Sequence, residues 1–296
     1  MTVAHRAAEE IEALLAQALP AGLYLVATPI GNLGDITLRA LAMLARADAL
    51  YCEDTRHSGV LLAHFSIGGR TMRPYHEHNA ERQRPRILVE LAAGKSVALI
   101  SDAGTPLVSD PGYKLVRHAL AAGHRVMSLP GPSAVLAALA SAGLATDTFL
   151  FAGFLPARQS ARRTRLAQLH AVPATLVFFE APSRLADCLG DIKVVLGPRS
   201  TAVARELTKL HEEVRRGTAS ELAEWATEAR PRGEIVVLVG PPVVHPVTDE
   251  IIAAKLTPML SVMSLSDAAK AAADDLGVAK ARAYDIGIAL KRHADG

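Results

Sequence analysis

One turn of the sequence is unusually rich in groups that can bind a small ligand. Residues 101–112 contain two carboxylates, three hydroxyl groups and two glycines, and they directly follow an apolar run typical of a buried strand. A carboxylate at the end of a strand can bind ribose hydroxyls or a ligand ammonium group, and Asp102 is placed to do so. Since a plain connection needs only about 2–6 residues, the longer turn favours a ligand site over a simple helix cap.

A second set of charged groups follows another apolar run. The segment Glu-Asp-Thr-Arg-His at 53–57 places Glu53 and Asp54 beside Arg56. Paired carboxylates can bind a metal ion or act as a general base, and they can equally form ordinary salt bridges with Arg56. The histidines of this region lack the spacing of a zinc site, so we expect no metal.

An arginine cluster follows the middle of the chain. It consists of Arg158, Arg162, Arg163 and Arg165. No acidic residue occurs from 155 to 179, which favours a phosphate-binding surface over a solvated helix face. Stacking aromatic residues are missing there, so base readout is not implied.

Two further segments suggest a cleft. Arg205, Glu206 and Lys209 belong to a charged segment that extends an apolar run, although solvated charge is the ordinary interpretation. Gly31 opens the segment Gly-Asn-Leu-Gly, where a missing side chain lets backbone N–H groups approach a ligand at a helix N-terminus. A tight turn is the alternative, and the spacing is that of neither a P-loop nor a dinucleotide fingerprint.

Alternating elements must position these groups. Apolar runs at 23–27, 49–52, 97–100 and 125–129 each end in a turn rich in glycine, proline or charge, and helical patterns accompany them. This alternation predicts a largely parallel α/β sheet, in which ligands bind beyond the carboxyl ends of the strands. All four turns fall at that edge.

The remaining chain predicts a different architecture. Strands are expected at 175–179, 193–196, 201–207 and 234–239, with helices at 158–170, 182–189 and 219–229, which indicates an α+β domain with mixed pairing. The predicted domains are an N-terminal helical extension at 1–20, an α/β domain at 21–143, a second domain at 144–243, and a linker with a helical segment at 244–296. That last segment has helix-turn-helix spacing, and a structural helical hairpin is the first interpretation.

Composition excludes several classes of protein. The chain has 296 residues, half of them hydrophobic, and a formal net charge of only +2, so any basic patch must be local. Its two cysteines lie far apart, which excludes a disulfide framework and predicts a reducing, cytoplasmic location. No window offers the ~20 apolar residues of a membrane span, and the start of the chain lacks the features of a signal peptide.

Together these motifs resemble the tetrapyrrole-methylase-fold S-adenosylmethionine (SAM) methyltransferases, over residues 22–242. The resemblance is carried by Leu-Tyr-Leu-Val-Ala-Thr-Pro-Ile-Gly-Asn-Leu-Gly-Asp at 23–35, Glu-Asp-Thr-Arg at 53–56, Ser-Asp-Ala-Gly-Thr-Pro at 101–106, Asp-Pro-Gly at 110–112, Pro-Gly-Pro-Ser-Ala at 130–134, Gly-Phe-Leu-Pro at 153–156 and Arg-Glu-Leu-Thr-Lys at 205–209. The second and the last motif mark the branch that 2′-O-methylates a cytidine in 16S ribosomal RNA, in the decoding region.

The resemblance implies a two-domain α/β enzyme, commonly a homodimer, that binds SAM between its domains and acts on 16S rRNA within the 30S subunit. The implied cofactor contacts are Ile30, Gly31, Asp102, Thr105, Ser133 and Ala134, with Phe179, Glu180 and Ala204 from the second domain. Candidate catalytic residues are Glu53, Asp54, Glu206 and Lys209, with no single base assigned. Candidate RNA-binding residues are Arg56, Arg205 and the arginine cluster.

Three alternatives stay open at this stage. A methylase of the same fold can act on a small tetrapyrrole, against which the RNA-branch motifs and the arginine cluster argue. A metal-dependent phosphohydrolase would use Glu53, Asp54 and Asp102 and would need no SAM. A non-catalytic RNA-binding module would not bind SAM at all.

Overall fold

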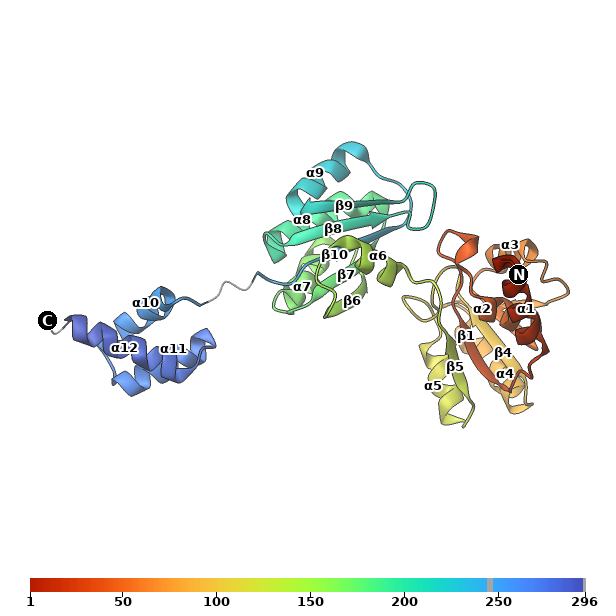
Figure 1. Cartoon of the computed structure of the whole chain (residues 1–296), viewed down its shortest axis with the longest axis horizontal. Coiled ribbons are helices and arrows are strands. Elements are labelled where there is room, and N and C mark those ends of the chain that lie inside the picture. Colours follow the sequence, from red (N-terminus) through yellow and green to blue (C-terminus); the bar gives the residue numbers. More distant parts are fainter. Residues whose placement is uncertain (244–246, 295–296) are drawn as a thin grey trace. The chain divides into compact units, whose positions relative to one another are not determined.

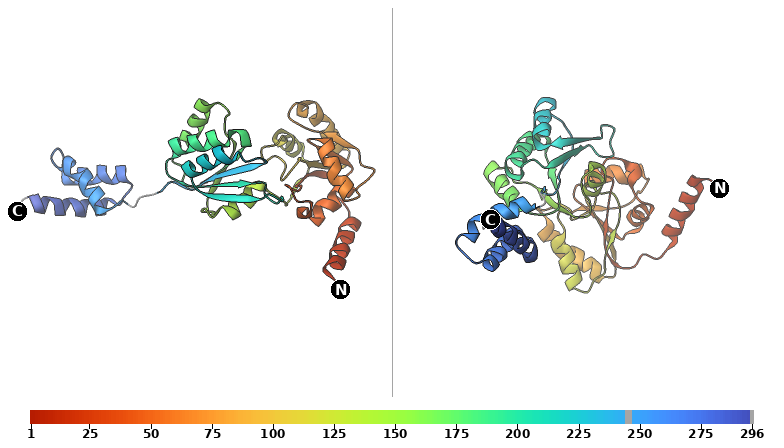
Figure 2. Two further views of the ribbon diagram at one scale, coloured as in Figure 1. Left: turned by 90° about the horizontal axis from the view of Figure 1, so that it is seen from above. Right: turned by 60° about the vertical axis from the view of Figure 1, so that its left-hand side comes forward.

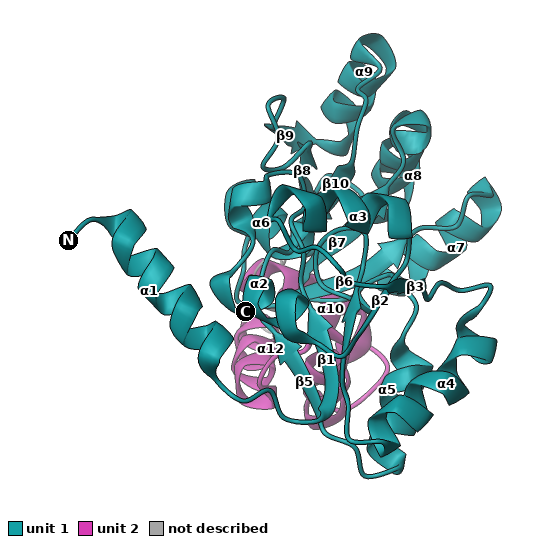
Figure 3. Ribbon diagram, turned by 90° about the vertical axis from the view of Figure 1, so that its right-hand side faces the viewer, with its two compact units in different colours: residues 1–242 teal, residues 243–296 magenta. Residues whose placement is uncertain are grey.

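The computed structural model describes residues 1–243 and 247–294 and separates the chain into two compact units, Met1–Pro242 and Val243–Gly296 (Figure 3). The first unit contains two five-stranded sheets, and the second is helical (Figure 1). The α/β fold with a parallel first sheet, a mixed second sheet and C-terminal helices is therefore confirmed. Part of the predicted linker, residues 244–246, lies outside the described residues.

The first sheet is parallel throughout, with strand order β3-β2-β4-β1-β5. Its strands are β1 (Gly22–Val26), β2 (Ala49–Cys52), β3 (Met72–Pro74), β4 (Ser96–Ile100) and β5 (Val126–Leu129). Its helices are α1 (Val3–Ala16), α2 (Leu38–Arg46), α3 (Thr55–His64), α4 (Ala80–Ala92) and α5 (Tyr113–Ala121), with the 3₁₀ turn η1 (Leu33–Asp35).

Successive residues of the central strands enter two apolar layers, as a parallel sheet covered on both faces requires. Tyr24 and Val26 pack with α2 and α3, whereas Leu23 and Leu25 pack with α4 and α5. The N-terminal helix α1 packs against α2 at the outer side of this sheet, away from the second sheet (Figure 2). All of its residues remain partly or fully exposed.

The second sheet is mixed, with order β6-β7-β10-β8-β9. Its strands are β6 (Phe149–Phe154), β7 (Thr175–Glu180), β8 (Ser200–Arg205), β9 (Glu213–Thr218) and β10 (Ile235–Val239). Only β6 and β7 are parallel, and the other pairs are antiparallel. The helices are α6 (Ala134–Ala142), α7 (Gln159–Leu169), α8 (Leu185–Leu196) and α9 (Ala219–Ala229), with the turn η2 (Pro182–Arg184).

The two faces of the second sheet have different partners. One face packs with α7, α8 and α9. The other packs with α6 and also with Ile30, which comes from the turn after β1. Ile30 therefore shares a buried apolar cluster with Val236 of β10, which connects the turn after β1 with the second sheet.

One predicted strand needs correction, and a strand was missed in each of the two sheets. The apolar run at 193–196 is the last turn of α8 and not a strand, because Leu189, Ile192 and Leu196 continue the buried face of that helix. The edge strands β3 and β9 were not predicted. Edge strands are often short or charged. The strand β3 has only three residues, and Arg215 and Arg216 interrupt the apolar residues of β9.

The second unit has its own core. Its helices are α10 (Asp249–Leu260), α11 (Leu265–Leu276) and α12 (Lys280–Ala294), and their buried residues are mostly alanine. Gly277 ends α11 with a φ of 64°, in the left-handed conformation that glycine adopts readily. This confirms the all-helical prediction. No helix within the described residues is long and apolar enough to cross a membrane.

Candidate functional site

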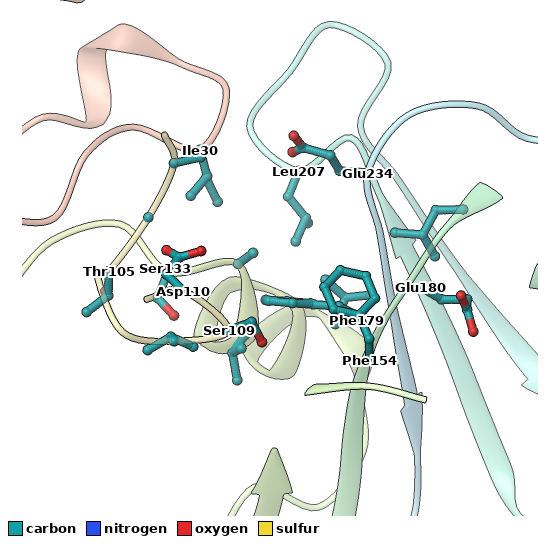
Figure 4. A pocket seen from close by; sticks show the side chains of 17 residues that line it. Ile30, Thr105, Ser109, Asp110, Ser133, Phe154, Phe179, Glu180, Leu207 and Glu234 are labelled. Atoms are coloured by element: carbon teal, nitrogen blue, oxygen red, sulfur yellow. The ribbon is translucent and has the colours of Figure 1, made fainter. Parts of the chain in front are cut away.

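A pocket lies where the carboxyl edge of the first sheet meets the second sheet (Figure 4), as expected for the ligand site of a parallel α/β sheet. Its cavity of about 270 Å³ is slightly smaller than the roughly 300–1,000 Å³ typical of ligand pockets. The turns that follow the strands of the first sheet contribute Ile30, residues 103–105 and residues 108–110, and the start of α6 contributes residues 133–135. The second domain contributes Phe154, Phe179, Glu180, Leu207 and residues 234–236.

The pocket lining is mostly apolar, and its charged members are acidic. Its lining includes the carboxylates Asp110, Glu180 and Glu234, and no lysine, arginine or histidine occurs among the lining residues. Glu180 pairs with Arg184 and Glu234 with Lys209, but Asp110 forms no ion pair with any residue in the described part of the chain. The walls therefore suit a ligand that combines apolar parts with net positive charge.

Asp110 was not among the predicted site residues, although its turn was singled out. Burial raises the pKa of Asp110 to about 6, and the nearby Glu53 carboxylate adds to the rise. Leu107 and Ser109 in the same loop have φ angles of 74° and 66°, a conformation that costs free energy in non-glycine residues and clusters at functional sites. A carboxyl group that titrates near neutral pH is suited to accept a proton.

Glu53 lies beside the pocket and not in its wall. It lines a small adjoining cavity with Tyr75, Ser101 and Asp110. Burial, and then the Asp102 carboxylate, raise the pKa of Glu53. Glu53 therefore acts on Asp110 through its charge.

Asp102 and Asp54 join two turns to each other. The backbone N–H of Asp54 donates to Asp102 Oδ1 at 2.9 Å. Asp54 also caps α3 by accepting from the Arg56 backbone N–H at 2.8 Å, and it pairs with the Arg56 side chain at 2.6 Å. The structure thus brings these predicted residues to the site's edge, but it places neither carboxylate among the lining residues.

The other glycine- and proline-rich turns are tied together by backbone contacts. Thr28 and Gly104 exchange two backbone hydrogen bonds of 2.9 Å, and the Thr105 hydroxyl donates to the Pro132 carbonyl at 3.3 Å. Ser133 caps α6 by accepting from the Leu136 N–H at 3.4 Å. Thr105, Ser133 and Ala134 consequently line the pocket, as predicted.

Glu206 and Lys209 belong to a closed ion-pair network. Glu206 accepts from Lys209 Nζ and from the Glu234 N–H, both at 3.0 Å, and Lys209 also reaches Glu234 at 3.1 Å. The Glu234 N–H and then Lys209 lower the pKa of Glu206. A carboxylate with two such donors is a weak proton acceptor, so the geometry argues against Glu206 as a base.

Gly31 contacts this network and does not line the pocket. A Cβ atom on Gly31 would lie 2.4 Å from Lys209 Cγ, and the neighbouring Asn32 N–H donates to Thr208 Oγ1 at 3.1 Å. Gly31 is therefore needed for close approach between the turn after β1 and the loop at 206–212. We call this contact the interdomain clasp.

The prediction of a four-arginine phosphate surface is wrong for Arg162. Arg162 is buried, and it pairs with the buried Asp191 at 2.7 Å, while Arg163 reaches the same carboxylate at 2.6 Å. The compensating acid lies on α8, far along the sequence, where the local pattern could not reveal it. Arg158 and Arg165 are exposed, whereas Arg205 pairs with Glu213 at 2.8 Å.

Ala204 and Phe179 differ in their placement. Ala204 is fully buried in the layer between the second sheet and α6, away from the pocket lining. Phe179 lines the pocket and packs edge-to-face against Phe151 and Phe154, with ring centroids 4.9 and 5.6 Å away. Phe154 was not predicted as a site residue, although it lies in one of the motifs.

Comparison with known proteins gives a consistent result. The family model described as Tetrapyrrole (Corrin/Porphyrin) Methylases matches residues 22–223. The chain is 59% identical over 228 residues to ribosomal RNA small subunit methyltransferase I of Mesorhizobium japonicum, covering 76% of this chain and 77% of the relative. It is 49% identical over 220 residues to the protein of that name from Escherichia coli O157:H7, covering 73% and 77%.

Solved structures share the fold at lower sequence identity. A cobalamin biosynthetic enzyme, cobalt precorrin-4 methyltransferase, aligns with a TM-score of 0.57 at 20% identity, covering 74% of this chain and 94% of that one. Uroporphyrin-III C-methyltransferase from Thermus thermophilus, complexed with S-adenosylhomocysteine, aligns with a TM-score of 0.51 at 24% identity, covering 74% and 97%.

Proposed function

The chain belongs to the tetrapyrrole (corrin/porphyrin) methylase family, and from that premise we propose that it transfers a methyl group from SAM to small-subunit ribosomal RNA. The acceptor we propose is the 2′-hydroxyl of a cytidine in 16S rRNA, presented by the 30S subunit. A homodimer and a cytoplasmic location remain predictions from the resemblance and the composition.

The charge of the pocket is the observation that carries the cofactor assignment. SAM is a cation with an apolar adenosine portion, and the pocket combines apolar walls with carboxylates and no basic lining residue. Ile30, Leu207 and Val236 would hold the apolar parts. Thr105, Ser133 and the backbone around Gly104 offer hydrogen-bonding groups, so few conspicuous side chains are needed.

Bound SAM supplies a methyl group already activated by its positively charged sulfur. With SAM bound, the 2′-oxygen would bond to the methyl carbon while the carbon–sulfur electron pair stays with sulfur, and the hydroxyl proton would pass to a nearby carboxylate. Such an in-line displacement depends mostly on proximity and orientation, which the two domains supply. We assign the proton to Asp110, because this carboxyl group lines the pocket and burial raises its pKa to about 6.

RNA must be held outside the pocket, because the lining has no cation to bind phosphate. The exposed arginines Arg56, Arg158 and Arg165 are the proposed phosphate contacts. Each such contact contributes mainly affinity and salt dependence and not sequence specificity.

The alternatives are less well supported. The relatives at 49% and 59% identity are named for ribosomal RNA, whereas the tetrapyrrole enzymes described above are only 20% and 24% identical. For a metal-dependent phosphohydrolase, three ligating side chains would be needed, and no group of three or more His, Cys, Asp or Glu residues that could hold a metal ion occurs within residues 1–243 and 247–294.

A pair of variants at Ala103 tests the cofactor assignment. Ala103 is exposed and lines the pocket, so a longer side chain is tolerated there. Ala103→Lys adds a cation and Ala103→Gln adds similar bulk without charge. We expect the Lys variant to bind SAM about tenfold more weakly than the Gln variant, through charge repulsion. Equal affinities by calorimetry contradict a charge-selected pocket.

Transfer to RNA is tested with 30S subunits from a strain that lacks the gene. Purified protein and SAM labelled in the methyl group should label 16S rRNA, and nuclease digestion should give 2′-O-methylcytidine. Binding of SAM without labelling of 30S subunits or of free 16S rRNA would contradict the RNA assignment.

A further inference from the structure

Phe154 has an unusual position for a large apolar side chain. It lines the pocket, yet 57% of its surface is exposed. Leaving an aromatic ring in water forfeits free energy that burial would supply. Figure 4 shows the Phe154 and Phe179 rings together on the β6–β7 side of the pocket.

The backbone of β6 is irregular just before Phe154. The pairing of β6 with β7 is regular from Phe149 to Phe151 and then shifts register before Phe154. Gly153 takes a φ of 66° within this irregularity. Such irregularities re-aim side chains and occur preferentially beside active sites.

A buried ion pair fixes the chain just after Phe154. Arg184 Nη2 donates to the Leu155 carbonyl at 2.6 Å and to Glu180 Oε2 at 3.3 Å. The Glu180 side chain is fully buried and also accepts from the Ala181 N–H at 2.8 Å. The exposed ring therefore packs against Phe179, and the Arg184–Glu180 pair fixes the backbone that follows the ring.

The position of Phe154 favours a ligand that arrives from solvent. Phe179 is the less exposed of the two rings and lies deeper, whereas Phe154 is open at the rim. Position 153 lies against Ser109, since a Cβ there would be 3.6 Å from Ser109 Oγ, so the ring stands beside the loop that carries Asp110. A nucleotide whose base rests on Phe154 would thus have its ribose near the proposed proton acceptor.

We propose that Phe154 is a stacking platform for the base of the target nucleotide, holding that nucleotide out of the RNA stack while its ribose is methylated. The proposal rests on the proposed function of the pocket. Because the pocket lining has no cation, an incoming nucleotide cannot be bound there through its phosphate. Every base has a face that can stack on an aromatic ring, so stacking can bind the nucleotide instead. Stacking also offsets the cost of unstacking a base from folded RNA.

Substitution of the ring should separate RNA from cofactor. Phe154→Leu should lower kcat/KM for 30S subunits by about 5- to 100-fold, as expected for loss of one stacked base. Phe154 lines the pocket assigned to SAM, but leucine keeps an apolar wall there, so the affinity for SAM should fall by a much smaller factor than kcat/KM. Retained SAM binding also verifies folding. Phe154→Tyr should retain transfer. The matched control is Phe149→Leu, since Phe149 is also on β6 and 41% exposed but lies outside the pocket lining.

A binding assay keeps the test independent of methyl transfer. The chain has a single tryptophan, Trp225, so Phe154→Trp combined with Trp225→Phe leaves one indole, in the pocket. We expect 30S subunits lacking the modification to quench its fluorescence further when SAM is already bound at saturation, so that any effect of SAM itself is constant. A loss of SAM affinity in Phe154→Leu that is as large as its loss of kcat/KM assigns the ring to the cofactor and overturns the proposal. Absence of quenching by 30S, or parental transfer by Phe154→Leu, overturns it as well.

The experiments distinguish failure of the proposed function from failure of the stacking proposal. A parental protein that binds SAM but methylates no RNA contradicts the proposed function, while the fluorescence assay still decides whether Phe154 meets RNA. Parental methylation of 16S rRNA with no effect of the Phe154 variants contradicts the platform alone.

Discussion

At the scale of single residues, the chemistry centres on a carboxyl group with few partners. Asp110 faces the pocket, is raised in pKa by burial and by Glu53, and forms no ion pair with another described residue. The predicted candidates have other tasks. Asp54 caps a helix, Asp102 accepts a backbone N–H, and Glu206 is held by Lys209.

The first prediction concerns the pH dependence of methyl transfer. Asp110 must be deprotonated to accept a proton, so the single-turnover rate should fall about tenfold per pH unit below about 6. Glu53→Gln removes a negative neighbour, which lowers the pKa of Asp110. The fall in rate, which we call the acidic limb of the pH profile, should therefore begin at lower pH. Asp110→Asn should be slow and lack the limb.

The outcome separates the two carboxyl groups. Rates measured from pH 5 to 8 on 30S subunits, with SAM at saturation, give the profiles. If Glu53→Gln abolishes transfer at every pH while Asp110→Asn keeps the parental profile, Glu53 is the base and our assignment of Asp110 is wrong.

The sequence indicated the site's turns better than its individual residues. Thr105, Ser133 and Ala134, which the family resemblance implied, line the pocket. Alternation of strands and helices predicted only that their turns share one edge of the sheet. Asp110 and Phe154 were missed because their importance comes from burial, a neighbouring charge and a register shift, which are properties of the folded chain.

At the scale of elements, the interdomain clasp closes the pocket. Asn32 and Thr208 hydrogen-bond across the domains, and the Lys209 stem lies where a Gly31 side chain would be. The clasp brings Leu207 and Glu234 to the pocket wall. The close approach of Lys209 explains why glycine is required at 31, although Gly31 is not among the residues that line the pocket.

The second prediction tests the clasp with a double-mutant cycle. Gly31→Ala should push Lys209 away and weaken SAM binding by about tenfold or more. Lys209→Ala shortens the opposing side chain, so in that background Gly31→Ala should cost much less. Calorimetric affinities of the four proteins give the coupling, and strictly additive effects would contradict a steric clasp between these two residues.

The third prediction concerns the buried pair of α7 and α8. Asp191→Ala leaves the Arg162 charge buried and uncompensated, which should lower the free energy of unfolding by about 3–5 kcal/mol. Arg163→Ala removes an exposed partner of the same carboxylate and should cost below about 1 kcal/mol. Urea unfolding compares the two variants, and similar losses would contradict a structural role specific to Arg162.

Helices and strands could be predicted where the spacing of hydrophobic residues was clear. The prediction was wrong where that spacing fitted both a helix and a strand. The central strands of the first sheet and the C-terminal helices were found because long runs keep one period. The run Lys-Val-Val-Leu at 193–196 has strand-forming residues, and only packing of α8 against the sheet decides that it is helical. Tertiary contacts override local preference at such positions.

At the scale of the whole molecule, the pocket belongs to one compact unit. Every lining residue falls between Ile30 and Val236, and the helical unit after residue 242 has a core of its own. The overall charge of +2 hides the contrast between an acidic pocket and exposed arginines elsewhere on the chain. Composition alone could not reveal that contrast.

The fourth prediction follows from this division. A chain truncated after Pro242 should bind SAM with the affinity of the full chain, because it keeps every residue of the pocket. Circular dichroism verifies folding and calorimetry gives the dissociation constant. A folded truncated chain that binds SAM more than tenfold more weakly would show that the helical unit contributes to the cofactor site.

The most direct test of the account is a map of ribose methylation in 16S rRNA from a strain that lacks the gene. Mass spectrometry of RNA fragments should show one cytidine without its 2′-O-methyl group, and the parental gene should restore that group. Asp110→Asn should restore it poorly. An unchanged methylation pattern in the deletion strain would contradict the central claim that this pocket methylates small-subunit ribosomal RNA.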